Sequence, residues 1–269
     1  MLFRTVVPLT CPAHVDPLRH ADQLTLIGSC FSEGVGQRLQ DCGHKALINP
    51  LGTIFNPVSL ARVVALLASG EEILDSDLEY CNRQQHYFSF EAGTSMVGED
   101  ASSCAEKLTE AIGAGRTALS QSACLFLTLG SAWAYVRPGS GPVANCRMSC
   151  PPATASAHLH KSTHAPPHTT ICVPSRITDR QPQAEFKRTL LCIDEIERSL
   201  VEAIASARSL NPSVRVVLTV SPVRHWREGP VESSRSKAHL LAAAHNVCEQ
   251  AESTVYFPSY ELLMDELRD

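Results

Sequence analysis

Residues 24–31 read Leu-Thr-Leu-Ile-Gly-Ser-Cys-Phe, and this stretch decides the fold class. Its first four residues form a short apolar run, which is typical of a buried parallel strand. Gly28 follows at the point where a tight turn is needed. Beyond the turn, Val35 and Leu39 are spaced as on one helix face, and Gly43 stands where a glycine commonly ends a helix. The stretch therefore predicts a strand, a glycine turn and a helix in direct succession.

The same alternation of short apolar segments and longer helical ones continues to the end of the chain. Further strands are predicted at residues 46–48, 123–129, 214–220 and 254–257, with a weak hairpin around 86–90. Helices are predicted at residues 56–67, about 103–119, 184–210, 232–251 and 260–268. Strands that alternate with helices of this length indicate βαβ units. The predicted fold class is therefore α/β, a three-layer α/β/α arrangement whose parallel sheet is covered on both faces.

Two of these helices have recognisable ends. Asn56-Pro57 is typical of an N-cap residue followed by proline at the first helical position, and Gly70 is expected to close that helix. Ser103 or a neighbour is expected to cap the helix that begins near it, because serine accepts hydrogen bonds from the free amides of a first turn.

Composition excludes several classes of protein. The 269 residues are 44% hydrophobic and 19% charged, as in an ordinary globular protein, and they can bury a sizeable core. A net charge of -5 argues against a nucleic-acid groove, which normally shows a basic excess. No apolar run is long enough for a membrane span, and residues 1–10 lack the cleavage site of a signal peptide. We therefore expect one domain over residues 1–269, a cytoplasmic location, and neither nucleic acid nor a membrane as partner.

The chain has eleven cysteines, an odd number, and none of them forms a Cys-x-x-Cys pair. A disulfide framework or a zinc ribbon would show tighter spacing. We expect most of these cysteines to be small buried hydrophobic residues in a reducing compartment.

Segment 149–183 interrupts the alternation of strands and helices, because it is rich in Pro, Ser, Thr and His and has no apolar periodicity. His160, His164 and His168 are four residues apart, a spacing that would place them on one helix face as metal ligands. Prolines flank them, however, and no cysteine or carboxylate completes a ligand set. The favoured interpretation is a disordered insert, and we expect neither a metal nor another cofactor.

Ser29 is the first candidate for chemistry, because it lies between a strand and a helix. The glycine before it permits a tight turn, and the helix directs its N-terminal amides and positive dipole end toward the turn. We expect the serine to be exposed at the carboxyl edge of the sheet, where its amide can donate to a developing oxyanion. Alternatively, Ser29 only caps the helix. Cys30 is a rival nucleophile, since a helix N-terminus can acidify a thiol.

Several blocks of unusual composition occur in a fixed order along the chain. They are Gly28-Ser29-Cys30-Phe31 with Gly34, 49–57 (Asn-Pro-Leu-Gly-Thr-Ile-Phe-Asn-Pro), 128–133 (Thr-Leu-Gly-Ser-Ala-Trp), 143–146 (Val-Ala-Asn-Cys), 219–225 (Thr-Val-Ser-Pro-Val-Arg-His), 235–238 (Arg-Ser-Lys-Ala), 256–261 (Tyr-Phe-Pro-Ser-Tyr-Glu) and 264–269 (Met-Asp-Glu-Leu-Arg-Asp). In these blocks and their order the chain resembles the GSCFA family. The resemblance covers the chain from about residue 24 to its end, apart from segment 149–183.

The resemblance implies a branch of the SGNH, or GDSL-like, hydrolases, which are acyl-ester hydrolases and transferases of flavodoxin-like topology. It makes Ser29 the catalytic nucleophile and assigns the amides of Ser29 and Gly52 to the oxyanion hole. The usual asparagine of the third block is Ala132 here, and Asn145 is the candidate replacement. The implied substrate is a small-molecule or glycan acyl ester.

The resemblance also implies a general base. The family continues past the last block into an Asp-x-x-His-Pro segment, before which this chain stops at Asp269. Arg147, at a position where the family generally has histidine, and segment 149–183 are further departures, and together they lead us to expect a truncated chain. His225 is the candidate base, because it follows a strand and is expected at the same sheet edge as Ser29. Alternatively, Arg224 and His225 line the substrate or hold neighbouring loops.

Two functions follow from these residues. The first is a serine esterase or acyltransferase that works through an acyl-enzyme. The second is a non-catalytic remnant that keeps the fold, and it predicts little or no turnover of short acyl esters. Trp133, Tyr135 and Trp226 are candidates to line an acyl or sugar pocket, although core packing explains them equally well. A phosphate-binding module is excluded because no GxxxxGK[ST] or GxGxxG motif occurs.

Overall fold

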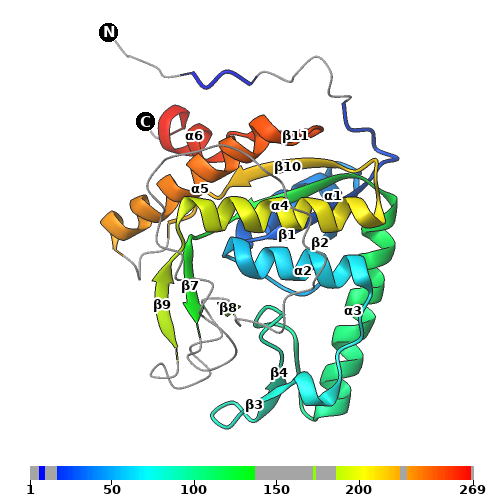
Figure 1. The fold of residues 1–269 in the computed structure, drawn as a ribbon. Helices are drawn as coiled ribbons and strands as arrows, with labels where there is room; N and C mark the ends of the chain where they lie inside the picture. The colour runs from blue at the N-terminus through cyan, green and yellow to red at the C-terminus, as the bar shows by residue number, and fades with distance from the viewer. Residues whose placement is uncertain (1–5, 10–16, 137–171, 174–185, 225–228, 268–269) are drawn as a thin grey trace, which may run out of the picture.

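A five-stranded parallel sheet forms the centre of the computed structural model, which describes residues 6–9, 17–136, 172–173, 186–224 and 229–267 (Figure 1). In the order in which they pair, its strands are β11 (Thr254–Phe257), β10 (Arg215–Val220), β6 (Ser122–Leu129), β1 (Gln23–Gly28) and β2 (Lys45–Ile48). Numbered within this sheet alone, the order is 2-1-3-4-5, which is the flavodoxin-like arrangement. The prediction of an α/β fold with a parallel sheet is confirmed.

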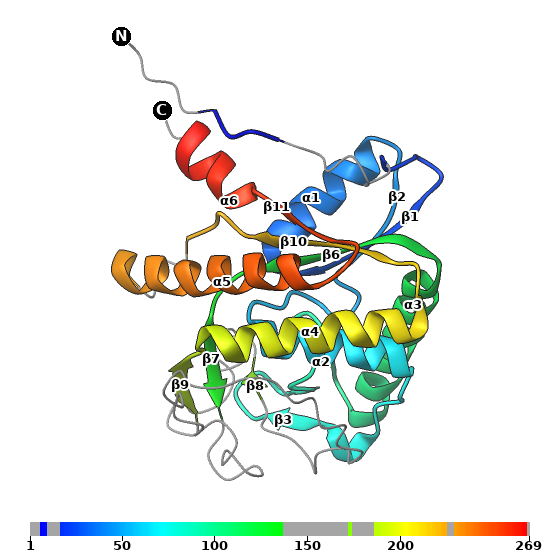
Figure 2. The ribbon, with the colours of Figure 1, turned by 45° about the horizontal axis from the view of Figure 1, so that its top comes forward.

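Helices cover both faces of the sheet, as Figure 2 shows. On one face lie α2 (Pro57–Ser69), α3 (Ala101–Gln121), α4 (Ile193–Leu210) and α5 (Pro230–Gln250). On the other lies α1 (Cys30–Asp41). Helix α6 (Ser259–Glu261) follows β11 and continues as a π-helical turn over Leu262–Glu266. A parallel sheet needs this cover because both of its faces carry apolar side chains.

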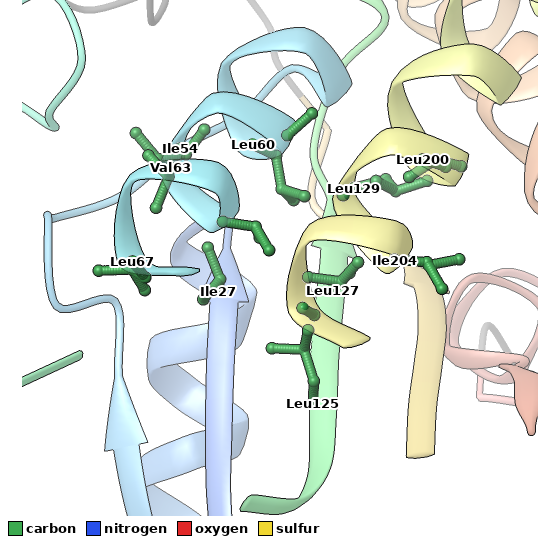
Figure 3. Packing of buried hydrophobic residues seen from close by; sticks show 14 of the residues in the cluster. Ile27, Ile54, Leu60, Val63, Leu67, Leu125, Leu127, Leu129, Leu200 and Ile204 are labelled. Carbon is green, nitrogen blue, oxygen red and sulfur yellow. The ribbon is translucent and has the colours of Figure 1, made fainter. Parts of the chain in front are cut away.

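The main core lies between the sheet and helices α2 and α4 (Figure 3). Its contributors are fully or almost fully buried: Ile27, Leu125, Leu127 and Leu129 from the strands, Leu60, Val63 and Leu67 from α2, and Leu200 and Ile204 from α4. Burying one such side chain contributes roughly 1.5–3 kcal/mol. On the opposite face, Leu24 and Leu26 pack against Val35 and Leu39 of α1. Because β1 is covered on both faces, its buried residues are consecutive rather than alternating.

Local signals locate the end of α2 correctly, but the cap of α3 lies earlier than Ser103. The Asn56 side chain accepts a hydrogen bond from the amide of Ser59 at 2.9 Å, and Gly70 closes α2 with φ 69°. In α3 the N-cap residue is Asp100, whose carboxylate accepts from the amide of Ser103 at 2.8 Å. A carboxylate at this position also interacts favourably with the positive end of the helix.

A second sheet departs from the prediction, since its strand β9 (Lys187–Leu190) lies within the range 184–210 that was predicted to be helical. Strand β9 pairs antiparallel with β7 (Trp133–Val136), which also pairs with β8 (Cys172–Val173). Helix α4 begins only at Ile193. Its N-cap residue is Cys192, whose amide donates a hydrogen bond to the Glu195 carboxylate. A partner strand distant in sequence therefore overrides the local helical pattern. Apart from β8, segment 149–183 lies outside the described residues.

A third sheet contains the predicted hairpin together with one more strand. It consists of β3 (Glu79–Cys81), β4 (His86–Phe88) and β5 (Val97–Gly98), all antiparallel. A small separate core of Cys81, Phe88, Phe90 and Phe186 stabilises it.

Candidate functional site

Ser29 lies at the carboxyl edge of the central sheet, at the point where the strand order reverses. Strand β1 pairs with β2 on one side and with β6 on the other, so the connections after β1 and β2 leave on opposite sides. In open α/β sheets ligands bind at this edge and at such a switch point. Ser29 is also the N-cap residue of α1, and its Oγ accepts a hydrogen bond from the amide of Phe31 at 3.4 Å.

The turn before Ser29 requires glycine. Gly28 has φ 150°, and a Cβ atom built on it would lie 2.2 Å from the carbonyl oxygen of Thr128. The amide of Gly28 donates to Asn49 Oδ1 at 2.9 Å, and its carbonyl oxygen accepts from the amide of Ile54 at 2.8 Å. The end of β1 is thus held between β6 and the loop that follows β2.

Asn49 and Glu33 organise that loop, and the sequence reasoning missed both. Asn49 has φ 43°, its amide donates to the carbonyl oxygen of Leu26, and its side chain donates to Glu33 Oε1 at 3.3 Å. The hydroxyl group of Thr53 donates to the same carboxylate oxygen. An asparagine directly after a strand tolerates a left-handed backbone, which was the available signal.

Gly52 lies in this loop, at the same sheet edge as Ser29. It has φ 81°, and Ser95 Oγ and the backbone of Gly93 leave little room for a side chain there. Both amides that the family scheme assigns to an oxyanion hole already donate hydrogen bonds. Ser29 N donates to the carbonyl oxygen of Thr128 at 3.1 Å, and Gly52 N donates to that of Asn49 at 2.8 Å. An oxyanion would have to share or replace these two bonds.

The expectation that Ser29 is exposed is wrong, because only 1% of the residue is accessible to solvent. Gly130, which follows β6, lies against it, so a Cβ atom on Gly130 would come within 3.0 Å of Ser29 Cβ and of the Phe55 ring. The amides of Gly130 and Ser131 donate to the carbonyl oxygen of Phe55 at 3.0 and 2.9 Å. The segment that follows β6 therefore lies against Ser29 and is itself bonded to the loop that contains Phe55.

Of the other predicted site residues, the structure describes Ala132, Trp133 and Tyr135. Ala132 is fully buried, and its amide donates to Ser236 Oγ at 2.7 Å, so its apolar side chain contributes no donor to the site. Trp133 and Tyr135 lie on β7, and the guanidinium group of Arg188 stacks on the Trp133 ring at 3.8 Å. The remaining predicted positions, Asn145, Arg147, His225 and Trp226, lie outside the described residues. Within the described part of the chain, no histidine is hydrogen-bonded to Ser29 Oγ.

A buried lysine also lies at this sheet edge, and the sequence reasoning did not single it out. Lys237 of α5 is 3% exposed, and its Nζ donates to the carbonyl oxygens of Gly130 and Ser221, both at 2.6 Å. These two carbonyl groups directly follow β6 and β10. The available signal was a lysine on the inner face of a helix, next to the buried residues Ser236 and Leu240.

The described cysteines are free thiols, and burial separates them into groups. Of the seven whose burial is described, Cys81, Cys104 and Cys124 are buried, as predicted for most of the eleven, Cys248 is half-buried, and Cys30, Cys42 and Cys192 are exposed. Burial raises the pKa of the Cys124 thiol to about 12 and that of the Cys248 thiol to about 11.

Alkylation with iodoacetamide at about pH 8 should therefore modify Cys30 and Cys42 in the native protein and spare Cys124. The thiolate is the reacting form, and a raised pKa together with burial leaves little accessible thiolate at Cys124. Peptide mass spectrometry measures the extent of modification at each position. The same reaction in concentrated guanidinium chloride is the control and should modify all three. Equal rates at Cys30 and Cys124 in the native protein would contradict the described burial.

The described residues contain neither a cluster of metal ligands nor a membrane-spanning helix. No three His, Cys, Asp or Glu side chains are grouped there so as to hold a metal ion. In the same residues, no helix has the length and apolar character needed to cross a membrane.

The comparisons with known proteins point to one family. Residues 23–269 match the model described as the GSCFA family. No curated protein and no solved structure matches the chain.

Proposed function

The chain belongs to the GSCFA family, and from this membership and the geometry of the serine turn we propose that Ser29 is the nucleophile of a serine hydrolase or acyltransferase of the SGNH type. The observation that carries the proposal is the position of Ser29. It follows a strand and an obligatory glycine, it begins a twelve-residue helix, and it lies at the switch point of a flavodoxin-like sheet. The positive end of α1 favours negative charge at this place.

The proposed reaction has two stages. Ser29 Oγ attacks the acyl carbon of an ester while His225 takes the hydroxyl proton. The bond to the leaving alkoxide then breaks, and the alcohol departs with that proton. Water or an acceptor hydroxyl releases the acyl group from Ser29 in the second stage, which regenerates the serine. Asn145 is proposed as the side-chain donor to the oxyanion, together with the amides of Ser29 and Gly52. A small-molecule or glycan acyl ester is the proposed substrate class, and the cytoplasm the proposed location.

A second candidate function is a non-catalytic protein that retains the fold, and three observations favour it. Ser29 is almost completely buried, its hydroxyl group accepts a hydrogen bond as a helix cap, and the amides of Ser29 and Gly52 are engaged. Catalysis therefore requires that the segments over Ser29 move apart when substrate enters. The non-catalytic alternative requires no such opening.

Covalent labelling with a fluorophosphonate separates the two functions. An activated serine forms an Oγ–P bond and expels fluoride, whereas a serine that only caps a helix does not react. We expect peptide mass spectrometry to find the adduct on Ser29. The matched control is Cys30→Ser, which removes the rival nucleophile next in sequence and should leave labelling in place. A folded protein without an adduct on Ser29, or labelling that disappears with Cys30→Ser, would contradict the proposal.

A further inference from the structure

A lysine that is 3% exposed needs an explanation, because moving an ammonium group out of water costs several kcal/mol unless it is well hydrogen-bonded. Lys237 lies on the inner face of α5 and donates two hydrogen bonds of 2.6 Å to backbone carbonyl oxygens. Bonds from a charged donor are shorter and stronger than those between neutral groups. The ammonium group thus joins two segments of the backbone.

The two segments are the ends of neighbouring strands at the edge where Ser29 lies. Gly130 follows β6 and Ser221 follows β10, and the amide of Ser221 donates to the carbonyl oxygen of Leu129 at 2.9 Å. Lys237 therefore continues the connection between β6 and β10 at the point where their ladder ends.

The segment after β6 is held from two sides. Ser236, the neighbour of Lys237, accepts a hydrogen bond from the amide of Ala132 at 2.7 Å. From the other side, the carbonyl oxygen of Phe55 accepts from the amides of Gly130 and Ser131. Gly130 is the residue that lies against Ser29. The position of Gly130 relative to Ser29 thus depends on the contacts that Lys237 makes.

We infer that Lys237 is a positioning residue of the serine site, which holds Gly130 against Ser29 by joining the ends of β6 and β10. Its significance for reactivity rests on the proposed nucleophilic role of Ser29, whereas its hold on the 130–132 segment does not. Small displacements in a reactive site have large effects, since a misplacement of about 1 Å can lower a rate roughly a hundredfold.

Three variants test this inference. Lys237→Met removes both the charge and the donors, whereas Lys237→Gln keeps an amide that can donate to carbonyl oxygens. Lys107→Met is the matched control. Lys107 also donates to two backbone carbonyl oxygens, those of Ser95 and Val97, but it is exposed and lies on α3.

Two readouts are needed, and the first does not depend on reactivity. In Lys237→Met, hydrogen–deuterium exchange should rise roughly tenfold at residues 129–132, while the protected core of α4 is unchanged. The maximal rate of fluorophosphonate labelling at Ser29 should fall roughly tenfold to a hundredfold, with the concentration for half-maximal rate unchanged. In Lys237→Gln, the exchange rate at residues 129–132 and the labelling rate at Ser29 should lie between those of the wild type and Lys237→Met. Lys107→Met should change neither rate.

Unchanged exchange at 129–132 in Lys237→Met would overturn the inference. So would a rise spread evenly over the whole sheet, which would indicate general loss of stability. Normal labelling in Lys237→Met despite locally raised exchange would also overturn the role at Ser29. If the wild-type protein is not labelled at all, the proposed function fails, and the exchange experiment alone decides whether Lys237 holds the 130–132 segment.

Discussion

Replacing Gly28 by alanine should lower the free energy of unfolding by about 3–5 kcal/mol. A Cβ atom at this position would lie 2.2 Å from the carbonyl oxygen and 2.9 Å from the side chain of Thr128, and the backbone φ of 150° is unfavourable for any residue with a side chain. Relief requires β1 and β6 to separate at their carboxyl ends. The central strand β6 and its neighbour β1 would lose contact there.

Denaturant unfolding followed by circular dichroism measures this change. The matched control is Gly34→Ala in α1, because nothing lies within 4 Å of a Cβ atom built on Gly34. Alanine in a helix interior restricts the unfolded chain more than glycine does, so the control should stabilise the protein by about 0.5–1 kcal/mol. Equal effects of the two substitutions would show that the turn at Gly28 does not have the described conformation.

Removal of the proposed nucleophile or of the proposed base should have the largest effect on reactivity. Ser29→Ala should abolish fluorophosphonate labelling, because the attacking oxygen is absent. His225→Ala should slow labelling by roughly three to four orders of magnitude, since a serine hydroxyl without a base is a poor nucleophile near neutral pH. Intact-protein mass spectrometry of samples quenched at successive times gives the labelling rate of each variant.

The control for His225 is His245→Ala. His245 lies on α5 and packs against the ring of Tyr256. This variant should be labelled at the wild-type rate. Circular dichroism must show that each variant is folded. Loss of labelling in Ser29→Ala combined with an unchanged rate in His225→Ala would keep Ser29 as nucleophile and exclude His225 as its base.

Local sequence was sufficient for most of the central architecture. The mainly apolar runs 24–27 and 123–129 predict strands buried on both faces, and β1 and β6 lie at these positions. Asn56-Pro57 and Gly70 predict both ends of α2, because caps are made by residues within a few positions of the helix end. Such local signals predict the structure correctly because the hydrogen-bond donors and acceptors of a helix cap are close together in the chain.

Prediction failed where the partner is distant in sequence. Residues 187–190 form β9 because they pair with β7, more than fifty residues earlier in the chain, and no local pattern indicates that partner. The role of Lys237 was not predicted, for the same reason. The carbonyl groups that its ammonium group contacts follow β6 and β10, and both are distant from α5 or separated from it by a loop.

The sequence by itself determined the fold class, the strand–glycine–serine–helix turn and the family, because each depends on residues close together or on blocks in a fixed order. Only the tertiary structure decided that Ser29 is buried with Gly130 against it and that the amides of Ser29 and Gly52 are engaged. The physical reason is that burial and hydrogen-bond partners at a sheet edge are set by segments from several strands, which meet only when the chain has folded.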